Sequence, residues 1–183
     1  MIMIYLILMK PPILKTKNFT LRPIRKGDGK SLQKNINNKK IYKYTATIPY
    51  PYSIKDAHNF VKDALLKYKN PESKSLVWVI DIDGEVVGGI GFHRIVAKHK
   101  AEIGYWLAEQ YWGKGIMTRA LKETTKYGFR KLQLKRIGAY VFRSNKGSYR
   151  VLEKSGYKLE GLLRKYQKKD GKLLDVYLFS KVK

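Results

Sequence analysis

Cysteine is absent from this sequence, and histidines are few. Without cysteine, the 183-residue chain has no disulfide, no thiolate nucleophile and no cysteine-ligated zinc. The three histidines, His58, His93 and His99, show no spacing typical of paired metal ligands. We therefore expect neither a metal site nor a cysteine-based reaction.

Long hydrophobic runs are also absent. The one apolar stretch, residues 1–9, ends at Lys10-Pro11-Pro12 and is far shorter than the roughly 20 residues that span a bilayer. It lacks the basic start and the cleavage site of a signal peptide as well. We expect residues 1–13 to form an N-terminal extension or an extra strand, with Met9 as an alternative start. Residues 14–183 should form one cytoplasmic domain.

Acidic residues number 14 against 39 lysines and arginines, which gives a net charge of +25. Such a charge attracts polyanions, so it favours RNA, a ribosome or an acidic protein surface as partner. A lysine-rich proteome accounts for the same charge without any such partner, and the sequence leaves both explanations open. It also leaves a monomer and a homodimer open, and we expect no association with a membrane.

Hydrophobic periodicity and turn residues predict a mixed α/β domain. Asp83-Gly84 is a typical two-residue hairpin turn, and Ser53 followed by Asp56 is typical of a helix start. Helix 53–68 carries apolar residues at helical spacing, and we expect it to bury that face, Phe60 included.

The expected elements follow one another in an order that indicates a mixed sheet. In chain order, the expected strands are residues 19–23, 76–82, 85–92, 102–107, 136–142, 156–161 and 173–179. The expected helices are residues 28–38, 53–68, 116–128 and 145–154. The resulting order, β-α-α-β-β-β-α-β-α-β-β, predicts helices on both faces of the sheet.

A glycine-bearing turn, residues 110–115 (QYWGKG), joins strand 102–107 to the helix that follows. Gly113 and Gly115 leave the backbone bare there, so the first N–H groups and the positive end of the helix dipole can face an anion such as a pyrophosphate. The spacing does not fit a Walker A loop. It does not fit a dinucleotide fingerprint either, because Thr118 stands in place of the third glycine. It fits the pattern Gln-x-x-Gly-x-Gly.

Together with the preceding strand AEIGYWL, residues 101–107, this turn resembles the acyl-CoA signature of the GNAT acetyltransferases and, within them, the RimJ/RimL-type branch. The resemblance runs from about Leu14 to the end of the chain. It implies a GNAT fold, with a mostly antiparallel central sheet in which two neighbouring strands splay apart, and acetyl-CoA as cosubstrate without a metal. The residues that it implies in acetyl-CoA binding are Ile103, Tyr105, Trp106, Leu107, Gln110, Gly113, Lys114, Gly115, Ile116, Met117, Thr118, Asn145 and Ser148.

A second signature of this family resembles the segment from Asn145 to Tyr157. By that resemblance, Asn145 binds the pantetheine arm and Ser148 protonates the leaving thiolate. Asn145 is also a natural N-cap for helix 145–154. Many family members carry a tyrosine where this chain has Leu152, which leaves Ser148, Tyr149 or a water as the proton donor.

Acetyl transfer to an amine needs a positioned thioester, a stabilised oxyanion, a base for the ammonium and an acid for the thiolate. Side chains alternate along a strand, so Glu102, Gly104 and Trp106 should share one face, where Gly104 leaves a notch for the thioester. The resemblance places a backbone N–H near Leu107 against the thioester oxygen. Glu102 is the candidate general base, directly or through a water. The alternative is that it only pairs with a lysine of the basic loop before it.

Tyr50 and Tyr52 are candidate acceptor-binding residues, because the resemblance places loop 43–52 beside the acceptor. Residues 94–100 and 164–172, both expected as loops, are strongly basic and would repel a polycation such as spermidine. We therefore favour the N-terminal α-amine of a protein, such as a ribosomal protein, over a small-molecule amine (amino acid, polyamine or antibiotic). A non-catalytic RNA- or ribosome-associated module is a third alternative, which the intact turn disfavours.

Overall fold

The computed structural model describes residues 10–183, so the expected extra strand within residues 1–9 lies outside the described part. Within residues 10–183, eight strands form one sheet in the order β1-β2-β3-β4-β5-β6-β8-β7. The strands are β1 (Leu14–Lys15), β2 (Thr20–Arg22), β3 (Leu76–Ile82), β4 (Glu85–Val96), β5 (Lys100–Leu107), β6 (Arg136–Phe142), β7 (Lys158–Lys169) and β8 (Lys172–Val182). Among the described strands, only β5 and β6 pair in parallel, which confirms the prediction of a mostly antiparallel mixed sheet.

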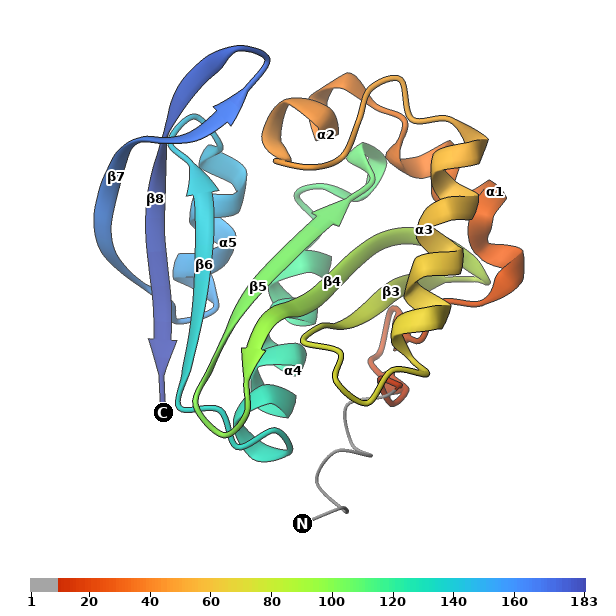
Figure 1. Ribbon diagram of the computed structural model, residues 1–183, viewed down its shortest axis with the longest axis horizontal. Coiled ribbons are helices and arrows are strands. Elements are labelled where there is room, and N and C mark those ends of the chain that lie inside the picture. Colours follow the sequence, from red (N-terminus) through yellow and green to blue (C-terminus); the bar gives the residue numbers. More distant parts are fainter. Residues whose placement is uncertain (1–9) are drawn as a thin grey trace.

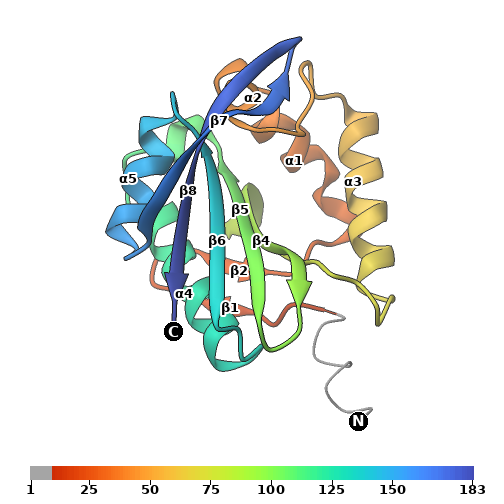
Figure 2. The ribbon, with the colours of Figure 1, turned by 60° about the vertical axis from the view of Figure 1, so that its left-hand side comes forward.

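Helices cover both faces of this sheet, as the order of elements predicts. They are α1 (Gly29–Ile36), α2 (Lys39–Tyr44), α3 (Ile54–Lys67), α4 (Ile116–Arg130) and α5 (Lys146–Lys154). Helices α1 and α3 lie on one face, and α4 and α5 lie on the other (Figures 1 and 2).

The alternation of strand side chains divides the buried residues into two cores. Trp78 of β3 points to the α4 side and packs in the larger core with Leu121 and Leu152. Its neighbour Val79 points to the α1 side and packs with Leu32 and other residues of α1 and α3. One sheet thus carries two separate hydrophobic layers, each stabilised by the apolar area that it removes from water.

A buried arginine ties the N-terminal segment to the sheet. Arg22 is 6% exposed; its Nη1 and Nη2 donate to the two Asp28 oxygens at 2.7 and 2.9 Å, and its Nε donates to Asp81 at 2.6 Å. Burial alone would lower the pKa of Arg22, but the hydrogen bonds to Asp28 and then Asp81 outweigh it and raise the pKa. Arg22, Asp28 and Asp81 are therefore all paired with an opposite charge, which offsets the cost of burying them.

The start of α3 confirms the predicted capping box. Ser53 Oγ accepts from Asp56 N at 3.1 Å, and the Asp56 carboxylate accepts from Ser53 N at 2.8 Å. The prediction for Phe60 is wrong: Ala57, Val61 and Ala64 are buried, but Phe60 is 38% exposed. Phe60 lies at the edge of the apolar stripe, and the structure opens a cavity there.

Helix α2 was not predicted, and it shortens the expected loop 43–52 at its start. Asn38 caps it, with its Oδ1 accepting from Lys40 N at 2.7 Å and from Ile41 N at 3.4 Å. Ile41 buries one side of the helix in the core beneath α1 and α3.

The predicted hairpin turn at Asp83-Gly84 is confirmed, with φ of 51° and 86°, the two positive values that a type I′ turn needs. The prediction of loops at residues 94–100 and 164–172 is wrong in part. Strand β4 continues to Val96, and β7 and β8 continue to a tight turn at Asp170-Gly171. The basic residues of the second segment therefore stand on a long hairpin.

Across residues 10–183, no helix combines the length and the apolar character that a membrane crossing requires. In the same residues, no three His, Asp or Glu side chains gather into a group able to hold a metal ion.

Candidate active site

The parallel pair β5 and β6 separates partway along its length, as expected of a splayed pair. Pairing runs from Lys100 opposite Arg136 to Glu102 opposite Gly138 and then stops. On its other edge β5 stays paired with β4 as far as Leu107. The two strands diverge in Figure 1, and a cavity of about 1700 Å³ opens where they do.

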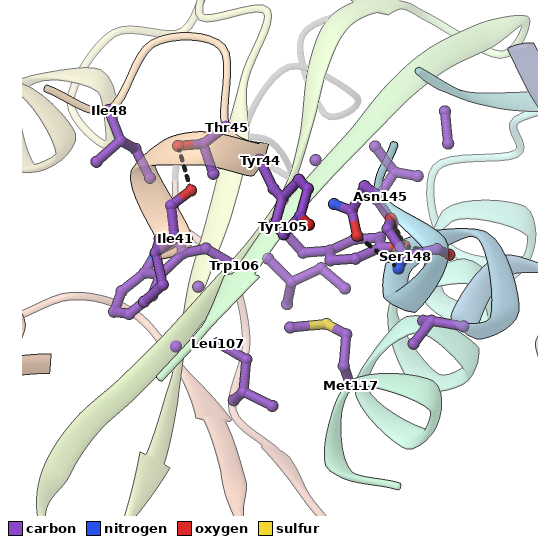
Figure 3. Close-up of a pocket in the computed structure, with 18 of the residues that line it drawn as sticks. Ile41, Tyr44, Thr45, Ile48, Tyr105, Trp106, Leu107, Met117, Asn145 and Ser148 are labelled. Carbon is purple, nitrogen blue, oxygen red and sulfur yellow. Dashed lines mark hydrogen bonds between the residues drawn. The ribbon is translucent and has the colours of Figure 1, made fainter. Parts of the chain in front are cut away.

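Strand β5 sends its side chains alternately to the two halves of this cavity, as predicted. Ile103, Tyr105 and Leu107 pack with the α4-side core, whereas Trp106 packs with the α1-side core. Figure 3 shows Tyr105 directed towards Asn145 and Ser148, with Trp106 on the side of Ile41. The strand is therefore the partition between two walls.

The glycine turn lies at the cavity and leads into α4. Gly113 and Gly115 both have φ of 75°, a left-handed conformation that side chains disfavour, and a Cβ at either position would meet nothing within 4 Å. Trp112 fixes the turn, because its Nε1 donates to Leu107 O at 2.7 Å. The turn thus holds backbone N–H groups against open space at a helix N-terminus.

Two residues of the turn point elsewhere. Gln110 Nε2 donates to the buried Asn35 Oδ1 at 2.9 Å, which anchors the turn to α1. The Lys114 ammonium lies over the Tyr111 ring, 5.5 Å from its centroid. Neither side chain lines the cavity.

Positive side chains from α4 and α5 surround the same end of the cavity. Those that line it are Arg119, Lys122, Lys146, Arg150 and Lys154. A helix N-terminus, bare backbone and several cations together favour a ligand with phosphate groups.

A hydroxyl pair lies on the α5 side of the splay. Tyr105 Oη is 2.8 Å from Ser148 Oγ, and Asn145 Oδ1 accepts from Ser148 N at 3.0 Å, so Asn145 is the N-cap of α5 (Figure 3). Burial raises the pKa of Tyr105, although the hydrogen bond to Ser148 opposes the rise. Both hydroxyls therefore keep their protons at neutral pH and can donate one to a nearby anion.

Tyr149, an expected alternative donor, lies elsewhere. Its ring packs edge-on against Phe179 and Tyr177, with centroids 4.9 and 5.4 Å apart, and it does not line the cavity. A helical residue next to Ser148 projects about 100° away around the axis, which turns Tyr149 towards the sheet. Tyr149 therefore points away from the cavity, and the hydroxyl beside Ser148 is that of Tyr105.

Glu102 lines the cavity but is bound to an arginine, not to a lysine of the basic segment. Arg94 Nη1 lies 2.7 and 2.9 Å from the two carboxylate oxygens. The contact arises from a bulge between His93 and Val96, where Arg94 has a φ of 48°. Glu102 would have to break this ion pair before it could take up a proton.

The opposite wall comes from α2, the loop after it and α3. Tyr52 lines it and is buried, and burial followed by the charge of Asp56 raises the pKa of Tyr52 to about 12. Tyr50 does not line it; the residue is 44% exposed, and its ring centroid lies 5.8 Å from that of Tyr42. The α3 residues on this wall are Asp56, Asn59, Phe60 and Asp63.

The β7–β8 hairpin reaches across to α2 above the splay (Figure 2). Lys169 Nζ donates to Thr45 O at 3.0 Å and lies 3.6 Å from the centroid of the Tyr42 ring. The Tyr42 hydroxyl also donates to Asp170. We call these contacts of Lys169 and Asp170 with α2 the hairpin latch, because they join the first and last parts of the described chain across the cavity.

Comparisons with known proteins identify this arrangement. Residues 18–158 match the model of the acetyltransferase (GNAT) domain family. The chain belongs to the GNAT acetyltransferase family. It is 34% identical to the N-acetyltransferase YoaA of Bacillus subtilis strain 168, over 94% of this chain and 97% of YoaA. It is an N-acetyltransferase.

Solved structures and other relatives agree with this assignment. The acetyltransferase MccE, which confers self-immunity to microcin C7 and was solved with acetyl-CoA and AMP, is 28% identical, with a TM-score of 0.82 over 97% of this chain and 99% of its own. Two enzymes of Escherichia coli strain K12 differ in acceptor. The ribosomal-protein-serine acetyltransferase is 32% identical over 58% of this chain and 60% of its own length, and the spermidine N(1)-acetyltransferase is 29% identical over 78% and 74%.

Most of the predicted site residues of this GNAT acetyltransferase come together around one cavity. Those that line it are Glu102, Ile103, Tyr105, Trp106, Leu107, Gly113, Gly115, Ile116, Met117, Thr118, Asn145, Ser148 and Tyr52. Gln110, Lys114, Tyr149 and Tyr50 do not. Most of the GNAT signature therefore surrounds the splay, whereas the side chains of Gln110 and Lys114 point away from it.

Sequence reasoning missed several residues of the wall formed by α2 and α3. Ile41 and Tyr44 come from the unpredicted helix α2, whose signal was Asn38 before a run with Ile41 and Tyr44 at helical spacing. Asn59 and Asp63 lie next to Phe60 on one side of α3. Their place at the cavity can be inferred only once that side of the helix is known to be uncovered. Nothing local in the sequence indicates that His93 lines the cavity.

Proposed function

We propose that this acetyltransferase transfers the acetyl group of acetyl-CoA to the N-terminal α-amine of a protein, such as a ribosomal protein. The size of the cavity carries the proposal. Its volume of about 1700 Å³ exceeds the ~300–1000 Å³ typical of a small-molecule pocket. Such a volume suits acetyl-CoA on one side of β5 and an extended acceptor on the other.

Acetyl-CoA fits the α4–α5 side. The bare turn at Gly113 and Gly115 can hold the pyrophosphate, and the cations of α4 and α5 can neutralise the phosphates. Beyond Glu102, the edge of β5 that faces β6 has no strand paired with it in the described structure. This edge can therefore pair with the pantetheine arm. Asn145 and Ser148 would then stand beside the thioester.

The reaction breaks one C–S bond and forms one C–N bond. The free amine attacks the thioester carbon, and the CoA thiolate leaves with a proton from the Tyr105–Ser148 pair. A backbone N–H near Leu107 would stabilise the oxyanion. The amine must first lose the proton of its ammonium form to a base on the Gly104 face of β5.

One argument for a protein acceptor needs correction. Of the two basic segments, residues 94–100 contribute only Arg94 as a cation to the cavity, and residues 164–172 contribute Tyr166 and Gln167 but no lysine. The lining of the acceptor side instead includes three carboxylates, Asp56, Asp63 and Glu102. A small amine with several positive charges is therefore the second candidate acceptor, in line with the relative that acts on spermidine.

Isotopic labelling of a cell extract tests the acceptor. The purified protein and deuterated acetyl-CoA are added to a desalted extract of its source, resupplied with the small-molecule fraction, and mass spectrometry locates the label. We expect label on the N-terminus of one or a few proteins. Label on polyamines alone would contradict this proposal and support the second candidate.

A matched variant makes the result specific. Label that persists with Ser148→Ala and Tyr105→Phe combined would not come from the reaction described here. Label that disappears with this variant, while acetyl-CoA still binds, assigns the transfer to this site.

A further inference from the structure

We infer that His93 is the base that takes the proton of the acceptor ammonium, through one bound water. The inference rests on the proposed acetyl transfer and specifies a residue for it. His93 lies on β4, opposite Glu102 in the strand register, and lines the cavity. Its ring points to the face that Gly104 leaves open.

Gly104 leaves open space next to the His93 ring. A Cβ at residue 104 would stand 3.7 Å from both Cδ2 and Nε2 of His93. The glycine therefore leaves a space that the imidazole borders, on the side of β5 that faces the acceptor wall. The His93 side chain is exposed where it lines the cavity, so its ring nitrogens are accessible to water.

The neighbouring carboxylate is less suited to the same task. Both oxygens of Glu102 lie against Arg94 Nη1. Arg94 reaches them because the bulge gives it a left-handed backbone, with φ of 48°. For a residue other than glycine this conformation is costly, and such costs are concentrated at functional sites. The bulge thus engages Glu102 and leaves His93 free.

The groups around His93 keep it neutral. The His93 side chain is exposed on the cavity surface, yet desolvation by the protein around it, then the charge of Lys67 on α3, lowers the pKa of His93; Glu102 on β5 opposes this, and Arg94 adds to it. The net pKa is below the usual value of about 6.5. At neutral pH the ring is therefore an unprotonated acceptor, the form that a general base needs.

The proton balance is simple. The ammonium gives one proton to a water, which gives one to a ring nitrogen of His93, and the amine lone pair then attacks the thioester. The imidazolium later returns the proton to solvent. The thiolate receives a separate proton on the Tyr105–Ser148 side, so no redox step or further reactant is needed.

Steady-state kinetics of His93→Gln test the assignment. The probes are synthetic hexapeptides with a free N-terminal Ser, Ala or Met and, separately, spermidine, with CoA release as the readout. A general base contributes roughly 100- to 10,000-fold, so we expect kcat to fall by about 100-fold or more while KM for acetyl-CoA stays within about twofold. His99→Gln is the matched control, because His99 lies in the β4–β5 turn outside the cavity.

The pH profile separates a base from a structural residue. In the wild type, kcat should rise with pH through a value below 6.5, and this limb should disappear in His93→Gln. Imidazole added to His93→Ala should restore part of the rate. A kcat of His93→Gln within about threefold of wild type, or an unchanged acid limb, would overturn the assignment.

NMR titration of the His93 ring gives a second test that requires no acceptor. The resonance is assigned by its loss in His93→Gln, and a pKa at or above 6.5 would overturn the assignment. If the wild type binds acetyl-CoA but acetylates neither probe, the proposed function fails and the base assignment fails with it. If it acetylates a probe and His93→Gln does so equally well, only the assignment fails.

Discussion

The two walls of the cavity differ in charge although the chain as a whole is strongly basic. On the α4–α5 wall five lining side chains are cations: Arg119, Lys122, Lys146, Arg150 and Lys154. On the other side the lining carries Asp56 and Asp63 of α3, together with Glu102 of β5 and Arg94, which form an ion pair with each other. The remaining cation there, Lys40, is paired with Glu109. A net charge of +25 therefore does not describe the field at the acceptor.

The difference matches the two substrates that an N-acetyltransferase must bring together. A CoA ester carries several negative charges, and an amine arrives as a cation before it loses its proton. Opposite charges on the two walls favour each ligand on its own side of β5 and oppose binding in the wrong orientation. Under the proposed function, specificity depends on the local charge of the two walls rather than on the overall composition of the chain.

The largest effect should come from substituting the two glycines of the bare turn, which should weaken the binding of acetyl-CoA to the basic wall. In Gly113→Val/Gly115→Val each residue must keep a left-handed backbone to hold the pyrophosphate, which costs about 1–2 kcal/mol per residue. At 1.4 kcal/mol per tenfold, we expect the acetyl-CoA Kd to rise by roughly 100-fold. Isothermal titration calorimetry measures it.

The matched control is Gly84→Val. Gly84 also has a positive φ, 86°, with nothing within 4 Å of an added Cβ, but it lies in the β3–β4 turn. It should lower the thermal stability without changing the acetyl-CoA Kd. Equal losses of affinity in both variants would show that strain alone, and not the turn, explains the effect.

Charge reversal on each wall should have a smaller and selective effect. We expect Lys122→Glu to raise the KM for acetyl-CoA by about fivefold, and Asp63→Lys to raise the KM for spermidine by a similar factor, since exposed charge pairs contribute up to ~1 kcal/mol. Each variant should leave the other KM within about twofold. Both effects should decrease at high salt.

Two exposed positions away from the cavity serve as controls. The control variants are Lys126→Glu and Glu72→Lys. Lys126 lies one turn after Lys122 on α4, Glu72 lies in the loop after α3, and neither residue lines the cavity. If Asp63→Lys affects a peptide with one positive charge as much as it affects spermidine, the acidic wall does not select for charge. Such a result would mean that only the basic wall selects its ligand by charge.

The elements that the sequence specifies well are those with local signals. The β3–β4 hairpin, Ser53 at the start of α3 and Asn145 at the start of α5 depend on residues within three or four positions of one another. Propensity and side-chain hydrogen bonding determine such features directly. The glycine turn belongs to this class, and its place at the cavity was predictable for the same reason.

The parts of the site that escaped prediction depend on contacts distant in sequence. Ser148 meets Tyr105, 43 positions away, and the ion pair of Glu102 requires the bulge at Arg94 in another strand. Phe60 has the spacing of a core residue, but the splay removes what would cover it. A local pattern cannot contain these facts, because the tertiary arrangement decides them.

The hairpin latch should have the smallest effect, because its contacts are only partly buried. Lys169→Met removes the bond to Thr45 O and the contact with the Tyr42 ring, together worth on the order of 1 kcal/mol. We expect a change of about two- to threefold in the KM for the acceptor, no change in the acetyl-CoA Kd, and faster amide hydrogen exchange near the Asp170-Gly171 turn. Lys168→Met is the control, since Lys168 is exposed and adjacent on the same strand, where alternating side chains point to the opposite face from Lys169. Equal changes in both variants would mean that the hairpin crosses the cavity without restricting the acceptor, and that the two walls act independently.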